Sequence, residues 1–172
     1  VEDGLIADFG AHLFRTGAPS VNEVIDCQGK CLAPGLIDVR VQLREPGEEH
    51  KETLASASLA ASHGGITTLV QLPNTNPVID DVPVLEFVAR RSRELKRTKI
   101  YCYGALTKGL EGREISVIGL LSEAGAVAFT AGERSLADAK VMPRAMTYSQ
   151  TFEACIVQHP AEPSLARTGV IN

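Results

Sequence analysis

The chain reads APGLIDVRVQLREPG at residues 33–47, and this stretch says most about the fold. Its apolar run predicts a β-strand over residues 36–43. Successive side chains on a strand point to opposite faces, so Asp38, Arg40, Gln42 and Arg44 share one side. Two polar side chains spaced two apart on one face can act on the same ligand.

Short apolar strands alternate with longer amphipathic segments after residue 36, which is typical of βα units and a parallel sheet. Further strands are expected at residues 66–72, 99–106, 126–130 and 154–158. Helices are expected at residues 51–63, 81–97, 114–124 and 138–151. Gly64-Gly65 and Gly125 should end the first and third helices as C-caps. The pattern predicts the α/β class.

Several motifs resemble the dihydroorotase family of the amidohydrolase superfamily. Residues 34–47 are similar to its first barrel strand, PGLID-x-H-x-H-x-REPG. Residues 72–80, LPNTNPVID, are similar to its MPNTNP-x-x-D loop. Residues 129–133 stand where the family has FTDDG, and residues 156–166 resemble its segment ending in HxED-x-x-LA.

The resemblance implies a partial TIM (β/α)8 barrel, with residues 34–172 as its first half. Residues 1–33, with turn signals such as Gln28-Gly29, would belong to a small β-sandwich or hairpin segment. Five strands are just over half of a barrel, and complete barrels need at least ~200 residues. We therefore expect this chain to be a piece of a longer protein, with the rest of the barrel outside it.

The family uses zinc, and the resemblance places ligands at positions 40, 42, 131 and 159. Only His159 is retained, since the others are Arg40, Gln42 and Ala131. A guanidinium has no acceptor atom and carries a permanent charge, so it repels a divalent metal. Gln42 offers only a neutral carbonyl oxygen, which suits harder cations. We expect no bound cofactor, and hence no metal-activated water for hydrolysis.

The resemblance also assigns a substrate-binding pair, Arg44 and Asn74, which would clamp a carboxylate. A planar guanidinium binds a carboxylate through two hydrogen bonds, and an amide adds a directed donor. The alternative is structural. Arg44 would then pair with Glu45 or Glu48, and Asn74 would form a local turn.

The composition describes an ordinary soluble globular protein, with 172 residues, 44% of them hydrophobic, and a formal net charge of −4. This charge gives no electrostatic case for nucleic acid or an acidic membrane. No apolar run reaches the ~18 residues of a transmembrane helix, so a cytoplasmic location is expected. The four cysteines are expected to be structural thiols, although Cys27 and Cys31 could form half of a metal knuckle.

The leading interpretation is a catalytically inactive dihydroorotase-like protein. Such homologues associate with aspartate transcarbamoylase as scaffold or regulatory subunits in pyrimidine biosynthesis, which implies that partner and a homo- or hetero-oligomer. One alternative is an active dihydroorotase or a related amidohydrolase of the allantoinase or hydantoinase type. Another is a sensor that binds dihydroorotate or carbamoyl aspartate through Arg44 and Asn74 without hydrolysing it.

Overall fold

The computed structural model describes residues 1–14, 17, 20–136, 138 and 140–159. The chain forms two compact units, Val1–Pro34 and Gly35–Asn172. No helix in the described part is both long enough and apolar enough to cross a membrane.

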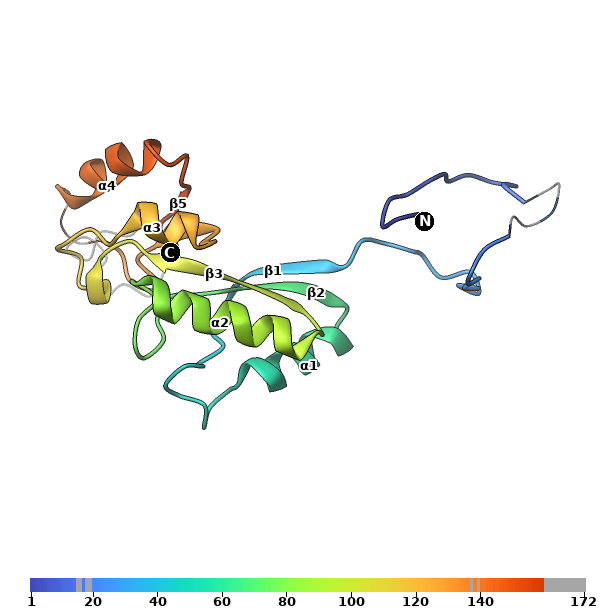
Figure 1. Ribbon diagram of the computed structural model, residues 1–172, viewed down its shortest axis with the longest axis horizontal. Helices are drawn as coiled ribbons and strands as arrows, with labels where there is room; N and C mark the ends of the chain where they lie inside the picture. Colours follow the sequence, from blue (N-terminus) through green and yellow to red (C-terminus); the bar gives the residue numbers. More distant parts are fainter. Residues whose placement is uncertain (15–16, 18–19, 137, 139, 160–172) are drawn as a thin grey trace, which may run out of the picture. The chain divides into compact units, whose positions relative to one another are not determined.

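The second unit is built on a parallel five-stranded sheet with strands in sequence order, curled into a half-barrel (Figure 1). Its strands are β1 Leu36–Val41, β2 Ile66–Gln71, β3 Lys99–Ala105, β4 Ala128–Thr130 and β5 Ile156–Val157. The helices are α1 Leu54–His63, α2 Val82–Leu95, α3 Ile118–Glu123 and α4 Val141–Gln150. The sequence prediction of an alternating α/β order is confirmed.

Local hydrogen bonds explain two of the differences from the predicted bounds, at the starts of α1 and α3. Helix α1 begins at Leu54 because Thr53 caps it and forms a capping box with Ser56. Helix α3 begins at Ile118 rather than 114, because Ser116 donates its backbone N–H to the Leu106 carbonyl, 3.2 Å away. The predicted glycine stop of α1 is confirmed, and Gly65 has φ +74°.

The sheet has different cores on its two faces. One face packs against the helices through the largest buried cluster, which includes Leu54, Leu69, Leu85, Ile100, Leu121 and Phe129. Cys102 belongs to this cluster, and burial raises the pKa of its thiol to about 12. All four cysteines are free thiols. The opposite face carries a smaller cluster of Val70, Leu72, Tyr103 and Ala128.

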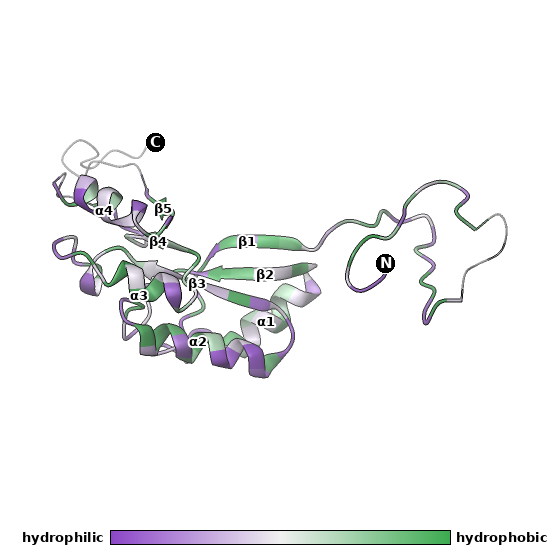
Figure 2. Ribbon diagram, turned by 45° about the horizontal axis from the view of Figure 1, so that its top comes forward, coloured by the Kyte–Doolittle hydropathy of each residue, from purple (hydrophilic) through white to green (hydrophobic). Residues whose placement is uncertain are grey.

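Strand β1 lies at the edge of the sheet and pairs with β2 alone among the described strands. Its apolar side chains Leu36, Ile37 and Val39 are each more than half exposed. Figure 2 shows this strand in the green of hydrophobic residues. The half-barrel therefore has an open apolar edge.

The first unit does not confirm the predicted β-sandwich. Its described residues contain a single isolated bridge, between Glu2 and Leu5, and no strand. The predicted turn at Gln28-Gly29 is present, with positive φ at both residues and a hydrogen bond from Lys30 N to Cys27 O. Apolar residues on both sides of this turn, such as Val24 and Leu32, are exposed. A short hairpin without a packed face is marginally stable, which explains why turn signals alone give no sheet here.

Candidate functional site

The loops that follow β1 and β2 dock on each other at the carboxyl ends of the strands. Asn76 donates its backbone N–H to the Pro46 carbonyl at 3.1 Å, and Leu72 donates to Val41 at 2.8 Å. Gly47 has φ +103°, and a Cβ added to it would lie 2.1 Å from the Asn76 carbonyl oxygen. Only glycine fits this approach, which brings the loops of Arg44 and Asn74 together.

Arg44 is held by an acid of its own loop. Its Nη1 lies 3.1 Å from Glu48 Oε2, and Glu48 also accepts a hydrogen bond from Lys51. That bond is the main cause of a lowered pKa at Glu48, so its carboxylate is charged at neutral pH. Any ligand carboxylate would have to compete with Glu48 for this arginine. The structural alternative for Arg44 is therefore present, and the predicted substrate clamp stays a prediction.

Asn74 lies close to the loop that follows β4. It is partly buried, and its Cβ is 3.9 Å from the position that a Cβ on Gly132 would take. Gly132 in turn lines a cavity at the ends of the strands. The second predicted clamp residue thus sits beside this cavity.

This mouth cavity, as we name it, contains two of the four predicted metal-ligand positions. Arg40 and His159 both line it, together with Leu72, Tyr103, Thr130, Gly132, Val157 and Gln158, and its volume is about 230 Å³. Parallel pairing of β4 and β5 brings Thr130 beside Val157. Burial, and to a smaller extent Cys155, raises the pKa of Tyr103, whereas the positive charge of Arg40 acts in the opposite direction.

The third ligand position, Gln42, is used in a hydrogen bond. Its side-chain Nε2 donates to Oε1 of Glu133, in the loop after β4. Glu133 stands one position after the two acids expected from the FTDDG pattern. The segment just after β1 and the loop after β4 are therefore joined by an amide and a carboxylate. Sequence reasoning noted both residues separately but missed their pairing, which needs three-dimensional proximity.

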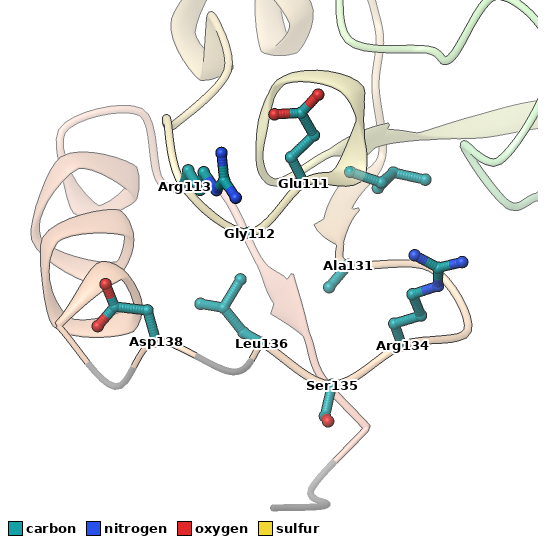
Figure 3. A pocket seen from close by; sticks show the side chains of 9 residues that line it. Glu111, Gly112, Arg113, Ala131, Arg134, Ser135, Leu136 and Asp138 are labelled. Atoms are coloured by element: carbon teal, nitrogen blue, oxygen red, sulfur yellow. The ribbon is translucent and has the colours of Figure 1, made fainter. Parts of the chain in front are cut away.

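The fourth position, Ala131, is buried and does not line the mouth cavity. It lines a larger pocket of about 640 Å³ between the loops after β3 and β4 (Figure 3). That pocket mixes two arginines, Arg113 and Arg134, with two acids, Glu111 and Asp138. Its charges balance, and it contains none of the other predicted site residues. Gly132, rather than Ala131, shares the mouth cavity with Arg40 and His159.

The Gln42–Glu133 hydrogen bond should couple the two residues energetically. In a cycle of Gln42→Ala, Glu133→Ala and the double variant, we expect a coupling free energy of up to about 1 kcal/mol, because the pair is exposed to solvent. Urea unfolding of the full-length protein measures it. A matched cycle of Gln42→Ala with Glu111→Ala should show no coupling. Equal values in the two cycles would contradict a specific bond.

Comparison with known proteins assigns this chain to one family. Residues 29–172 match the family model described as "Dihydro-orotase-like". A dihydroorotase of Syntrophobacter fumaroxidans is 42% identical over 100% of this chain and 39% of its own length. One of a Wolbachia strain from Brugia malayi is 41% identical over 99% of this chain and 38% of its own length. The chain thus spans about two-fifths of the curated relatives it matches.

A solved structure supports the fold. The L-hydantoinase (dihydropyrimidinase) of Arthrobacter aurescens superposes with a TM-score of 0.63 and 18% sequence identity, over 78% of this chain and 31% of that one. At this identity the similarity concerns the fold alone, and it agrees with the curled parallel sheet. Since the family match covers most of the residues and begins just before β1, this chain belongs to the dihydroorotase-like family.

Proposed function

We propose that this chain is part of a catalytically inactive dihydroorotase-like protein that acts as a scaffold or regulatory subunit in pyrimidine biosynthesis. One observation carries the proposal: Arg40, which stands where the resemblance places a metal ligand, lines the same cavity as His159, the one histidine at such a position. The family is zinc-dependent. A fixed guanidinium charge opposes binding of a divalent cation in that cavity.

The remaining residues do not fit a zinc ion. Among the described residues there is no group of three or more His, Cys, Asp or Glu side chains that could hold a metal. The amide N–H of Gln42 is directed at Glu133, and Ala131 has no ligating atom. Catalytic zinc sites in proteins normally use three protein ligands. The described residues therefore offer too few metal-binding atoms for a zinc centre that could activate water for hydrolysis.

The resemblance supplies the partner part of the proposal. Aspartate transcarbamoylase is the expected partner, in a homo- or hetero-oligomer in the cytoplasm. The loop motifs after β1 and β2 support a scaffold role, because their docking rests on the backbone hydrogen bond from Asn76 to Pro46 and on the close approach at Gly47, which involve none of the expected ligand positions. Co-elution with aspartate transcarbamoylase of the same organism in size-exclusion chromatography tests this association.

We expect the full-length protein to contain no stoichiometric zinc and to show no dihydroorotase turnover. The physical reason is that two positions of the ligand set now carry a cation and a neutral amide. Elemental analysis after growth with added zinc, and an assay of dihydroorotate hydrolysis with and without chelator, measure both. Roughly one zinc per chain, or turnover that a chelator abolishes, would overturn the proposal in favour of an active amidohydrolase.

A further inference from the structure

We propose that the outward face of α2, at its C-terminal end, is the surface on which the scaffold binds an acidic segment of its partner protein. We name it the α2 basic surface, and it consists of four exposed cations, Arg90, Arg93, Lys96 and Arg97. The inference rests on the proposed function, since it takes the partner of the scaffold as the occupant. It adds the place of contact and the chemistry that the partner presents there.

Positive charge is concentrated at this end of α2. Residues 90–99 contain six of the 17 basic residues of the chain and a single acid, Glu94, whereas the whole chain has 21 acidic residues. Figure 2 shows α2 changing from green in its first half to mostly purple in its last two turns. Because the chain outside residues 90–99 is acidic, these cations form a local patch and do not reflect a general positive charge.

The backbone of α2 turns the cations outward. Arg90 and Arg93 are three residues apart and therefore lie on the same face of the helix, on neighbouring turns. Lys96 ends α2 in the left-handed conformation, with φ +51°, and Arg97 follows it. The other side of α2 packs into the main core, and its neighbours α1 and α3 both contact it. The helices that flank α2 are thus already in place, and they leave the basic surface exposed.

The charges of this surface are not used within the described part of the chain. None of its four cations makes an ion pair there, whereas Arg91 lies 3.6 Å from Glu45 and 3.3 Å from Glu94. The helix dipole favours cations in the last turn, which accounts for Arg93 but not for Arg90. Like charges three residues apart repel each other. Carboxylates from another molecule would remove this repulsion and pair with the planar guanidinium groups.

The pattern of charge favours a protein over a uniform polyanion. Glu86 is exposed and lies one turn before Arg90 on the same face, so the face begins with an acid and continues with cations. Nucleic acid or an anionic lipid surface would be repelled by Glu86, whereas a protein can present a cation opposite it. Sites for single-stranded nucleic acid also use aromatic side chains for base stacking, and none of the exposed residues of α2 is aromatic. Arginine is enriched at protein interfaces.

The affinity of the full-length protein for aspartate transcarbamoylase of the same organism, measured by calorimetry, tests the inference. The triple charge reversal Arg90→Glu, Arg93→Glu, Arg97→Glu should weaken binding at least about a hundredfold, because attraction becomes repulsion. Replacing the same three residues by lysine should cost about tenfold, since the charge remains without the planar fork. Binding by the parent should also weaken between about 50 and about 300 mM NaCl, because salt screens exposed charges.

Two control variants separate a specific surface from net charge. Arg134→Glu, Lys140→Glu, Arg144→Glu makes the same change in net charge at exposed cations before and within α4, and should alter affinity by less than about threefold. Glu86→Lys should weaken binding of the partner about threefold, because it repels the cation expected opposite Glu86. The same substitution would instead tighten binding of a uniform polyanion.

The outcomes distinguish this inference from the proposed function. If the parent binds aspartate transcarbamoylase and the α2 reversal costs no more than the α4 control, this inference alone is wrong. If the parent does not bind it, both proposals fail. Tighter binding of a DNA duplex or of phosphatidylserine vesicles than of the protein partner, increased by Glu86→Lys, would assign the surface to a polyanion. Thermal unfolding identifies any variant that does not fold, in which case the lysine variant and Glu86→Lys decide.

Discussion

The triple variant Arg40→His, Gln42→His, Ala131→Asp of the full-length protein should take up about one zinc per chain, whereas the parent takes up none. A histidine at position 40 would line the mouth cavity beside His159, and one at position 42 would lie just after β1, two residues along the chain. Three imidazoles form a sufficient donor set, and removal of Arg40 also removes the repelling charge. The expected gain in zinc affinity is several orders of magnitude, measured by competition with a chromogenic chelator.

We expect the same variant to show no appreciable hydrolysis of dihydroorotate. Orientation of metal ligands depends on hydrogen bonds from surrounding residues, and these need not persist where the ligands themselves have changed. In this chain Gln42→His also removes the amide that donates to Glu133. Turnover near that of an active dihydroorotase would show that the surroundings were kept, and that the loss concerns the ligands alone.

Two further variants sharpen this test. A variant that carries Gly132→Asp in place of Ala131→Asp should bind zinc about tenfold tighter, because position 132 lines the mouth cavity and a Cβ there meets no atom closer than 3.6 Å. The backbone at φ +75° adds some strain, which aspartate tolerates better than most residues. The matched control Arg40→Ala, Gln42→Ala, Ala131→Asp removes the charge without adding imidazole. Zinc uptake by this control would show that the metal binds elsewhere.

Gly47→Ala should be strongly destabilising. The new Cβ would overlap the Asn76 carbonyl oxygen at 2.1 Å and Asn76 Cβ at 2.7 Å, and the backbone at φ +103° disfavours any side chain. Overlap with backbone atoms cannot be relieved by a rotamer change. We expect the free energy of unfolding to fall by about 3 kcal/mol or more, measured by urea denaturation of the full-length protein.

Gly65→Ala is the matched control for this substitution. Gly65 also has positive φ, +74°, but a Cβ there meets nothing within 4 Å. The loss should therefore be about 1 kcal/mol, from backbone strain alone. Similar losses for both variants would contradict the close docking of the loops after β1 and β2.

Much of the half-barrel could be predicted from sequence because its signals are local. The apolar run of β1, the alternation with amphipathic segments and the glycines after α1 each act within a few residues. The bounds of α3 could not be predicted in this way, since they depend on the bond from Ser116 to Leu106 across a loop. The small 3-10 helix Lys108–Leu110 was missed for a similar reason, because its turn lies in the returning loop.

The sequence names candidate site residues, whose roles stay predictions, but it does not give the geometry between them. Strand alternation placed Arg40 and Gln42 on one face, and motif spacing indicated His159. Which loop residue after β4 enters the cavity depends on the backbone at Thr130–Gly132, where Gly132 has φ +75°. Gln42 and Glu133 lie 91 residues apart in the sequence, so their pairing depends on how the strands between them are arranged in the sheet. The predicted β-sandwich of the N-terminal segment is not confirmed, because turn signals alone do not give a hairpin an apolar face to pack against.

The division of the sheet into two faces has an evolutionary consequence. The main core lies between strands and helices, whereas positions 40, 42, 131 and 159 are all absent from it. Substitutions at the solvent-accessible positions 40, 42 and 159 therefore leave the main core untouched, whereas position 131 is buried and accepts only a small side chain without cost. Relatives with variable ligand positions over a constant core would record such substitutions.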